Sequence, residues 1–147
     1  QLKEENHLRW DSLGEFCALG ESLNFLAKTN DNPKAAILGK AVETATQELL
    51  DKNKSPSRKV GEEDNRTSHF YFSLYWARAL AKQKQNLEIS SHFEKIAKSL
   101  EENENTIVEE LMAPQGKEVD LGGYYHTDPI KVRKIMRPSE TLNRIIP

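Results

Sequence analysis

The chain has 147 residues, of which 30% are charged and 37% hydrophobic, a balance that allows about one domain with its own apolar core. Its 21 Lys and Arg against 23 Asp and Glu give a net charge of −2, which argues against nucleic acid as a partner. No apolar run approaches the length of a membrane span, and the start QLKEENHLRW does not resemble a signal peptide. We therefore expect a cytoplasmic protein with no membrane partner.

Two amphipathic helices are predicted in the first third of the chain. Asp11 and Ser12 offer N-cap chemistry, and Glu15, three residues after Ser12, completes a capping-box pattern. The helix that follows carries apolar residues at helical spacing and ends in a polar stretch. Pro33, preceded by an asparagine, predicts the start of a second helix that ends near Asp51.

A loop and a central helix are predicted next. Residues 52–65 combine Pro, Gly, Ser and alternating charge without an apolar period, which is typical of a loop. Residues 66–83 are apolar on most sides and rich in aromatic residues, so we expect a helix that is buried on more than one face. A strand is the alternative for the portion HFYFSLYW, but the continuation ARALAKQ favours the helix.

A further long helix is predicted in the second half of the chain. Ser90 or Ser91 is the expected N-cap, and apolar residues continue at helical spacing to Met112. A break is expected near residues 103–105.

The C-terminal region begins with a long connection, residues 113–128, which is rich in Gly and polar residues. A short extended piece is expected at 118–121. Asp128, followed by a proline, predicts a short helix, and Ser139 a final helical turn. The fold class is thus mainly α: residues 1–147 form a single helical domain of about five to six helices, with a long irregular connection before the last ones.

No catalytic or metal-binding pattern is apparent in the sequence. The four histidines lie on different predicted elements, and none is spaced as a metal-binding pair. Cys17, the only cysteine, lies on an apolar helical stripe and is expected in the core. The glutamates within residues 101–110 are expected to form a solvated helix face. Neither glycine-rich phosphate-binding motif is present, and Gly122 with Gly123 is typical of a simple turn.

Two arginines offer more specific chemistry. Arg58 lies in a loop with Lys54, Ser57 and Lys59, a combination of charge and hydroxyl groups that suits a phosphate, although solvated basic loops are common. Arg9 stands beside a tryptophan just before a predicted helix start, where it suits a phosphate contact or stacking on a base. The alternative for Arg9 is an aliphatic stem packed on the tryptophan with its charge in water.

Five stretches, in order along nearly the whole chain, resemble the C-terminal segment of the monomeric-type NADP-dependent isocitrate dehydrogenases. They are LRWDSLGEF (8–16), NKSPSRKVGEEDNR (53–66), SHFYFSLYWARALA (68–81), GGYYH (122–126) and RPSETLN (137–143). Five blocks at matching separations are far more specific than one short motif. The resemblance implies oxidative decarboxylation of isocitrate to 2-oxoglutarate with NADP as the hydride acceptor.

The resemblance also implies roles for particular residues. Arg9 and Arg58 match arginines that grip the 2′-phosphate of NADP, and Asp11 matches an aspartate that contacts the cofactor. The family's catalytic residues, and its ligands for isocitrate and for Mg or Mn, lie upstream of the segment that this chain resembles. We therefore expect no catalytic residue and no metal ligand here, and no turnover from the chain alone. Its expected partners are NADP and the N-terminal part of a two-domain enzyme.

A second hypothesis is that the chain is a stand-alone helical module for protein interaction. Apolar surface that lacks its normal cover tends to find partners. Self-association through such a face is therefore also expected of the isolated chain.

Overall fold

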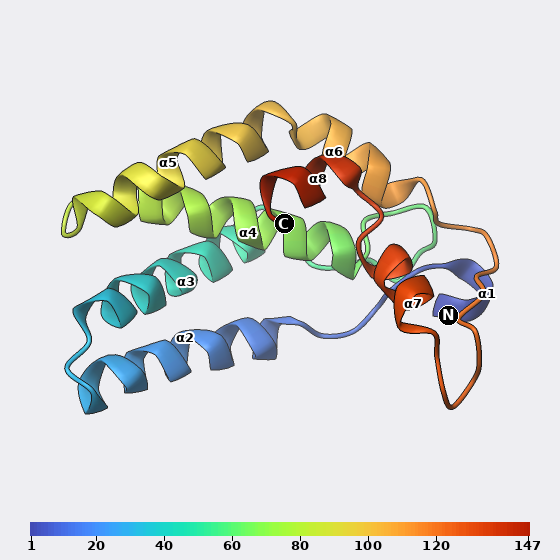
Figure 1. Ribbon diagram of the computed structural model, residues 1–147, viewed down its shortest axis with the longest axis horizontal. Helices are drawn as coiled ribbons and strands as arrows, with labels where there is room; N and C mark the ends of the chain where they lie inside the picture. The colour runs from blue at the N-terminus through green and yellow to red at the C-terminus, as the bar shows by residue number, and fades with distance from the viewer.

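The first half of the chain forms an antiparallel helical hairpin. In the computed structural model, which describes residues 1–147, α2 (Leu13–Thr29) and α3 (Pro33–Asp51) lie side by side along their length (Figure 1). Asn32 accepts a hydrogen bond from the amide of Ala35 at 3.2 Å, and Pro33 occupies the first turn of α3. The predicted start of the second helix is therefore confirmed.

The start of α2 differs from its predicted chemistry. Ser12 is the N-cap residue, but its side chain caps no amide of the helix. Its hydroxyl is buried and instead accepts a hydrogen bond from Nδ2 of Asn65 at 3.3 Å. Oδ1 of Asp11 takes over the cap by accepting from the amide of Leu13 at 3.1 Å, and Glu15 accepts from Nε1 of Trp10 at 3.3 Å. The predicted capping box is wrong because a tertiary contact uses the serine.

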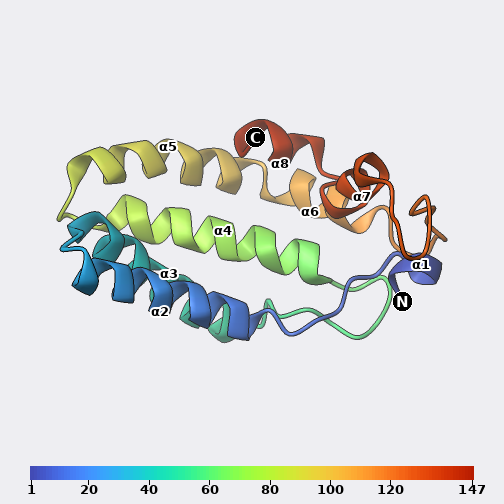
Figure 2. The same cartoon turned by 60° about the horizontal axis from the view of Figure 1, so that its bottom comes forward.

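A long helix, α4 (Asn65–Lys82), runs through the middle of the molecule. It lies between the α2–α3 hairpin on one side and α5 (Leu87–Glu102) with its C-terminal neighbours on the other (Figure 2). The helix interpretation of the aromatic run is therefore confirmed. One core cluster of 14 buried residues joins α4 to its neighbours; they are Phe16, Val42, Ala45, Leu49, Phe70, Tyr71, Phe72, Leu74, Tyr75, Ala77, Ala97, Leu100, Ile107 and Leu111.

The N-cap of α5 lies four residues before the first predicted one. Asn86, not Ser90 or Ser91, is the N-cap, and its side chain accepts from the amide of Ile89 at 3.0 Å. Oε1 of Gln83 accepts from the amide of Asn86 at 2.9 Å and so shapes the turn that precedes the helix. Sequence spacing alone did not reveal this turn, because it depends on a side chain that folds back on the backbone.

The last third of the chain contains α6 (Glu104–Met112), α7 (Pro129–Met136) and α8 (Glu140–Ile145), and a short helix α1 (Leu2–Glu5) opens the chain. The caps predicted at Asp128 and Ser139 are confirmed, since Asp128 accepts from the amide of Ile130 at 2.8 Å and Ser139 from that of Leu142 at 3.0 Å.

The mainly α class is confirmed, although the helices number eight rather than five or six. α1 accounts for part of the difference, and the predicted break at Asn103, which separates α5 from α6, accounts for the rest. The extended piece expected at 118–121 forms no strand, because its backbone makes only isolated hydrogen bonds to other segments, from the amide of Val119 to the carbonyl of Lys3 and from the amide of Asp128 to the carbonyl of Leu121. None of the helices combines the length and apolar character that crossing a membrane requires.

Cys17 is exposed, and its expected place in the core is wrong. α2 packs mainly on α3, and it buries only Phe16 and Gly20. A helix that packs mainly on one neighbour buries a narrower stripe than its apolar pattern covers. Cys17 falls outside that stripe.

The acidic run of α5 and α6 is more than a solvated face. Glu101 pairs with Arg78, and Glu110 accepts hydrogen bonds from the hydroxyls of Ser139 and Thr141. Burial alone would raise the pKa of Glu110, but these bonds, with one from the amide of Thr141, lower it below its ordinary value. Glu110 thereby holds α8 against α6.

A buried ion pair joins three parts of the chain. The guanidinium of Arg66 lies 2.7 Å from Oδ2 of Asp64, and the two side chains are only 2% and 0% exposed. The same guanidinium donates to the side chain and the carbonyl of Asn6, after α1, and to the carbonyl of Ile135 in α7. Both ends of the chain are thus held at the N-terminus of α4.

Replacing Asp64 with Ala should strongly destabilise the fold, because it leaves the charge of Arg66 buried without its counterion. We expect a loss of about 3–5 kcal/mol in the free energy of unfolding, measured by urea denaturation. Lys98→Ala, which removes an exposed pair with Glu102, is the control and should change it by less than about 0.5 kcal/mol. Similar small losses in both variants would contradict the role assigned to the buried pair.

Candidate functional site

The segment that carries Arg9 is clamped onto the N-terminus of α4. Asn65 contacts it on both sides: its amide donates to the carbonyl of Leu8 at 2.9 Å, and its side chain accepts from the amide of Trp10 at 2.6 Å and donates to the carbonyl of Trp10 at 3.0 Å. Oδ2 of Asp64 accepts from the amide of Leu8 at 3.1 Å. Arg9 therefore projects from a backbone that is fixed on either side of it.

The loop that carries Arg58 lies against the same segment. Nε2 of His7, a residue only 1% exposed, lies 2.8 Å from the carbonyl oxygen of Ser57. The other ring nitrogen of His7 lies 2.8 Å from Oε1 of Gln115, which also accepts from the amide of Gly61. This buried histidine places the residue before Arg58 next to the segment that ends in Arg9.

The two arginines differ from the other polar groups of the loop. Both are exposed, and neither guanidinium forms an ion pair or a hydrogen bond within the chain. Lys54, in contrast, pairs with Glu63 at 2.9 Å and lies over the ring of Tyr71. The basic loop therefore leaves fewer free cations than its sequence indicates.

Ser57 and Lys59 also have partners inside the loop. The hydroxyl of Ser57 donates to Glu62, and this hydrogen bond, helped by the charge of Lys59, lowers the pKa of Glu62 below its ordinary value. The ammonium of Lys59 lies 3.7 Å from the carboxylate of Glu62. Arg58 is left as the unpaired cation of the predicted phosphate-binding group.

Asp11, the third predicted site residue, lies beside Trp10 and is exposed. One of its carboxylate oxygens caps α2 through the amide of Leu13, and the other has no hydrogen-bond partner in the chain. Its capping contact fixes the direction of the side chain. The free oxygen can accept a hydrogen bond from a ligand hydroxyl.

The residues that position the site were not singled out in the sequence. His7, Asp64 and Asn65 are buried, and their hydrogen bonds fix both segments. A polar DN pair at a predicted helix start is a recognisable cap signal, but its long-range partners at residues 8–10 are not visible in one sequence. No three His, Cys, Asp or Glu side chains come together in a way that could hold a metal ion.

Comparison with known proteins gives these residues a family context. The family model described as monomeric isocitrate dehydrogenase matches residues 1–147. The chain belongs to the monomeric isocitrate dehydrogenase family. It is 57% identical over 146 residues to the NADP isocitrate dehydrogenase 2 of Psychrobacter sp. strain 13A. The aligned region covers 99% of this chain and 20% of that protein.

Two further relatives agree with this membership. The chain is 54% identical over 143 residues to the NADP isocitrate dehydrogenase of Azotobacter vinelandii, covering 97% of this chain and 19% of that protein. It is 50% identical over 143 residues to the NADP isocitrate dehydrogenase 2 of Mycobacterium tuberculosis, with the same coverage of 97% and 19%. The chain thus spans about a fifth of the length of these relatives, and the predicted family is confirmed.

Replacing Asn65 with Ala should release the segment that carries Arg9. The amide and carbonyl of Trp10 lose their partner, and we expect a loss of about 1–3 kcal/mol in the free energy of unfolding. Hydrogen exchange followed by mass spectrometry should show that the amide of Trp10 exchanges faster in the variant than in the unchanged chain, whereas the amides of α5 exchange at the same rate in both. Asn105→Ala, on the exposed side of α6, is the matched control and should leave exchange at residues 8–10 unchanged.

Proposed function

We propose that this chain is the C-terminal portion of an NADP-dependent isocitrate dehydrogenase and that it supplies the grip on the 2′-phosphate of NADP. The observation that carries the proposal is the pair Arg9 and Arg58, two exposed guanidinium groups without protein partners on segments joined through His7. The activity of the whole enzyme is the oxidative decarboxylation of isocitrate to 2-oxoglutarate with reduction of NADP.

Arginine suits the 2′-phosphate of NADP for a physical reason. A phosphate dianion is best held by planar guanidinium groups, each of which donates two parallel hydrogen bonds, and the 2′-phosphate is what distinguishes NADP from NAD. The guanidinium groups of Arg9 and Arg58 donate no hydrogen bond within the chain, so all of their N–H groups are available to a ligand. The free oxygen of Asp11 suits a hydroxyl of the cofactor and cannot contact the phosphate without repulsion.

The remaining chemistry of the reaction belongs outside this chain. The family's catalytic groups and its ligands for isocitrate and for Mg or Mn lie upstream of the segment that the chain resembles. A divalent cation bound there would hold the substrate and stabilise negative charge during decarboxylation. We therefore propose that the isolated chain has no dehydrogenase activity and that it forms part of one domain of a two-domain, cytoplasmic enzyme.

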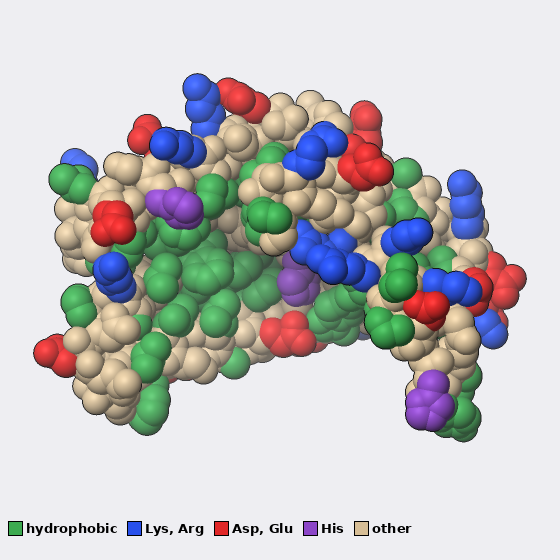
Figure 3. Space-filling model, viewed as in Figure 1, with side chains coloured by type: hydrophobic (Ala, Val, Ile, Leu, Met, Phe, Trp, Pro, Cys, Tyr) green, Lys and Arg blue, Asp and Glu red, His purple; other side chains and the backbone are tan.

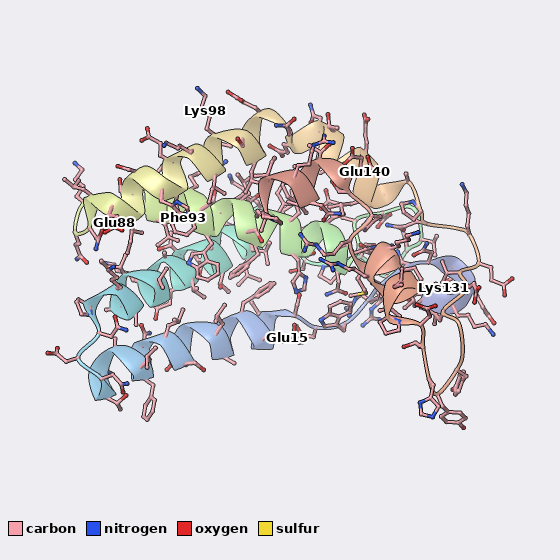
Figure 4. All side chains as sticks on the ribbon, in the orientation of Figure 1. Glu15, Glu88, Phe93, Lys98, Lys131 and Glu140 are labelled. Atoms are coloured by element: carbon pink, nitrogen blue, oxygen red, sulfur yellow. The ribbon has the colours of Figure 1, made fainter.

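An apolar surface of the chain supports the proposal that another part of the same enzyme packs against it. Hydrophobic side chains gather in the hollow between α2 and α5 (Figure 3), and Phe93 lies there between α5 and α4 (Figure 4). Leu38 and Trp76 are likewise only partly buried against the core. A contiguous apolar surface of this kind is typical of a covered interface. The relatives are about five times longer than the chain, which provides the material to cover it.

Replacing both arginines with Gln in the intact dehydrogenase should weaken NADP binding selectively. Each charge-assisted contact is worth about 1.5–3 kcal/mol, so we expect the KM for NADP to rise about tenfold or more for each arginine. The KM for isocitrate should stay nearly constant, and the preference for NADP over NAD should fall by the same factor as NADP binding.

Two further variants sharpen this test. Lysine at both positions keeps the charge but loses the paired hydrogen bonds, so its effect should be intermediate. Lys98→Gln, on the exposed side of α5, removes a cation from a helix that contacts neither arginine segment and should change neither KM. Equal effects of the double variant on NADP and isocitrate would contradict the assignment.

The isolated chain should self-associate through the same apolar surface. Light scattering should show a mass above that of the monomer at high protein concentration, because burying the surface against a second copy removes it from water. Trp76→Gln should reduce this association, whereas Tyr124→Gln, on a distant loop, should not. If the isolated chain stays monomeric at every concentration, the apolar surface does not drive association and this prediction is wrong.

A further inference from the structure

Two tyrosines at the tip of one loop are the most exposed large hydrophobic residues of the chain. Tyr124 is 84% exposed and Tyr125 is 88% exposed. The loop that carries them projects away from the helices beside α1 and α7 (Figure 1), and hydrophobic side chains and a histidine gather at its end (Figure 3). The rings meet edge to face, 5.0 Å apart, so each tyrosine supports the other and leaves most of its own surface in water.

The tip has a backbone that only glycine allows. Gly122 has φ +81°, and a Cβ there would lie 2.6 Å from Cβ of Asp128. A Cβ on Gly123 would lie 2.4 Å from the carbonyl oxygen of His126. The turn is therefore folded tightly on itself, and these two positions have no room for a side chain.

The base of the loop is pinned as well. The amide of Asp128 donates to the carbonyl of Leu121 at 2.8 Å, which closes the loop. Asp120 accepts from the amide of Gly122 at 2.8 Å and pairs with Lys131 of α7, which is labelled in Figure 4. The loop is thus preorganised, although its tip contacts nothing else in the chain. Preorganisation of this kind lowers the entropic cost of binding.

We infer that the tip Tyr124–His126 is a preformed hook that inserts into the rest of the dehydrogenase polypeptide. Tyrosine is enriched among the residues that dominate protein interfaces, because it buries a large ring and donates one hydrogen bond. The hook therefore fits an apolar recess with carbonyl or carboxylate acceptors at its floor.

The position of the hook favours this partner over a second copy of the chain. The amide of Val119, just before the loop, donates to the carbonyl of Lys3 in α1, and α1 leads directly into the segment that holds Arg9. The hook and the arginine pair therefore belong to the same end of the molecule. A cofactor held by those arginines must reach the groups that bind isocitrate, so the rest of the enzyme has to approach this end. This inference rests on the proposed function.

The first test is modification of tyrosine in the isolated chain and in the intact dehydrogenase. The chain has four tyrosines; Tyr71 and Tyr75 are 5% and 3% exposed and serve as internal references. Nitration by tetranitromethane, located by mass spectrometry, should modify Tyr124 and Tyr125 in the isolated chain and should be about tenfold or more slower in the intact enzyme. Equal rates in both proteins would overturn the inference.

The same experiment distinguishes other occupants. If protection already appears in the isolated chain and grows with its concentration, a second copy covers the hook, and the inference is wrong. Because nitration does not depend on NADP, its result is separate from the arginine test. The inference about the hook can be wrong while Arg9 and Arg58 still bind the phosphate. Likewise, the arginine assignment can be wrong while the hook is still buried in the intact enzyme.

The second test replaces both hook tyrosines with Ala in the intact enzyme. The melting temperature of the isolated chain should stay the same, since the two rings bury little surface within it. The melting temperature of the intact enzyme should fall by several degrees, because the hook loses its contact. Leu87→Ala removes a side chain that is 74% exposed, at the first position of α5, and is the matched control. No greater loss for the tyrosine pair than for Leu87→Ala would contradict the inference.

Discussion

The buried guanidinium of Arg66 is the interaction on which the arrangement of this chain depends. Its five N–H donors are all used, by the carboxylate of Asp64, by the side chain and carbonyl of Asn6 and by the carbonyl of Ile135. Burying a charge is costly unless every donor is satisfied, so the geometry of these partners is tightly specified. Lysine has three donors and no planar fork, and it could not replace this arginine. The first helix, the central helix and α7 are thereby held in one relative position.

The candidate cofactor site follows from that arrangement. Arg9 lies three residues after Asn6, and Asn65, next to Arg66, holds the backbone on both sides of Arg9. The two kinds of arginine differ in what they contact. The guanidinium of Arg66 donates all of its hydrogen bonds within the chain, whereas those of Arg9 and Arg58 donate none. A rigid backbone that carries free guanidinium groups suits the recognition of a phosphate. Because the backbone is already ordered, binding costs little further conformational entropy.

The surfaces that the chain leaves open agree with the proposal that it is part of a longer enzyme. The hollow between α2 and α5 is lined by hydrophobic side chains, and the loop that contains Gly122 and Gly123 presents Tyr124 and Tyr125 to solvent. Burial also raises the pKa of Tyr75 to about 12, as expected for a phenol that is 3% exposed in the core around α4. The hollow and the loop therefore lack partners within the chain, although the hollow borders a well-packed core.

The sequence by itself determined the helical class, the limits of the central helix and the caps at Asn32, Asp128 and Ser139, because these depend on periodicity and on contacts within a few residues. It also revealed the family and its candidate arginines. Only the tertiary structure decided that Ser12 serves Asn65 instead of its own helix, that Cys17 is exposed and that Lys54 and Lys59 are paired while Arg58 is free. Each of these depends on which groups meet across long separations in the chain. A local pattern shows which contacts a residue can make, and the packing of distant segments decides which of them it does make.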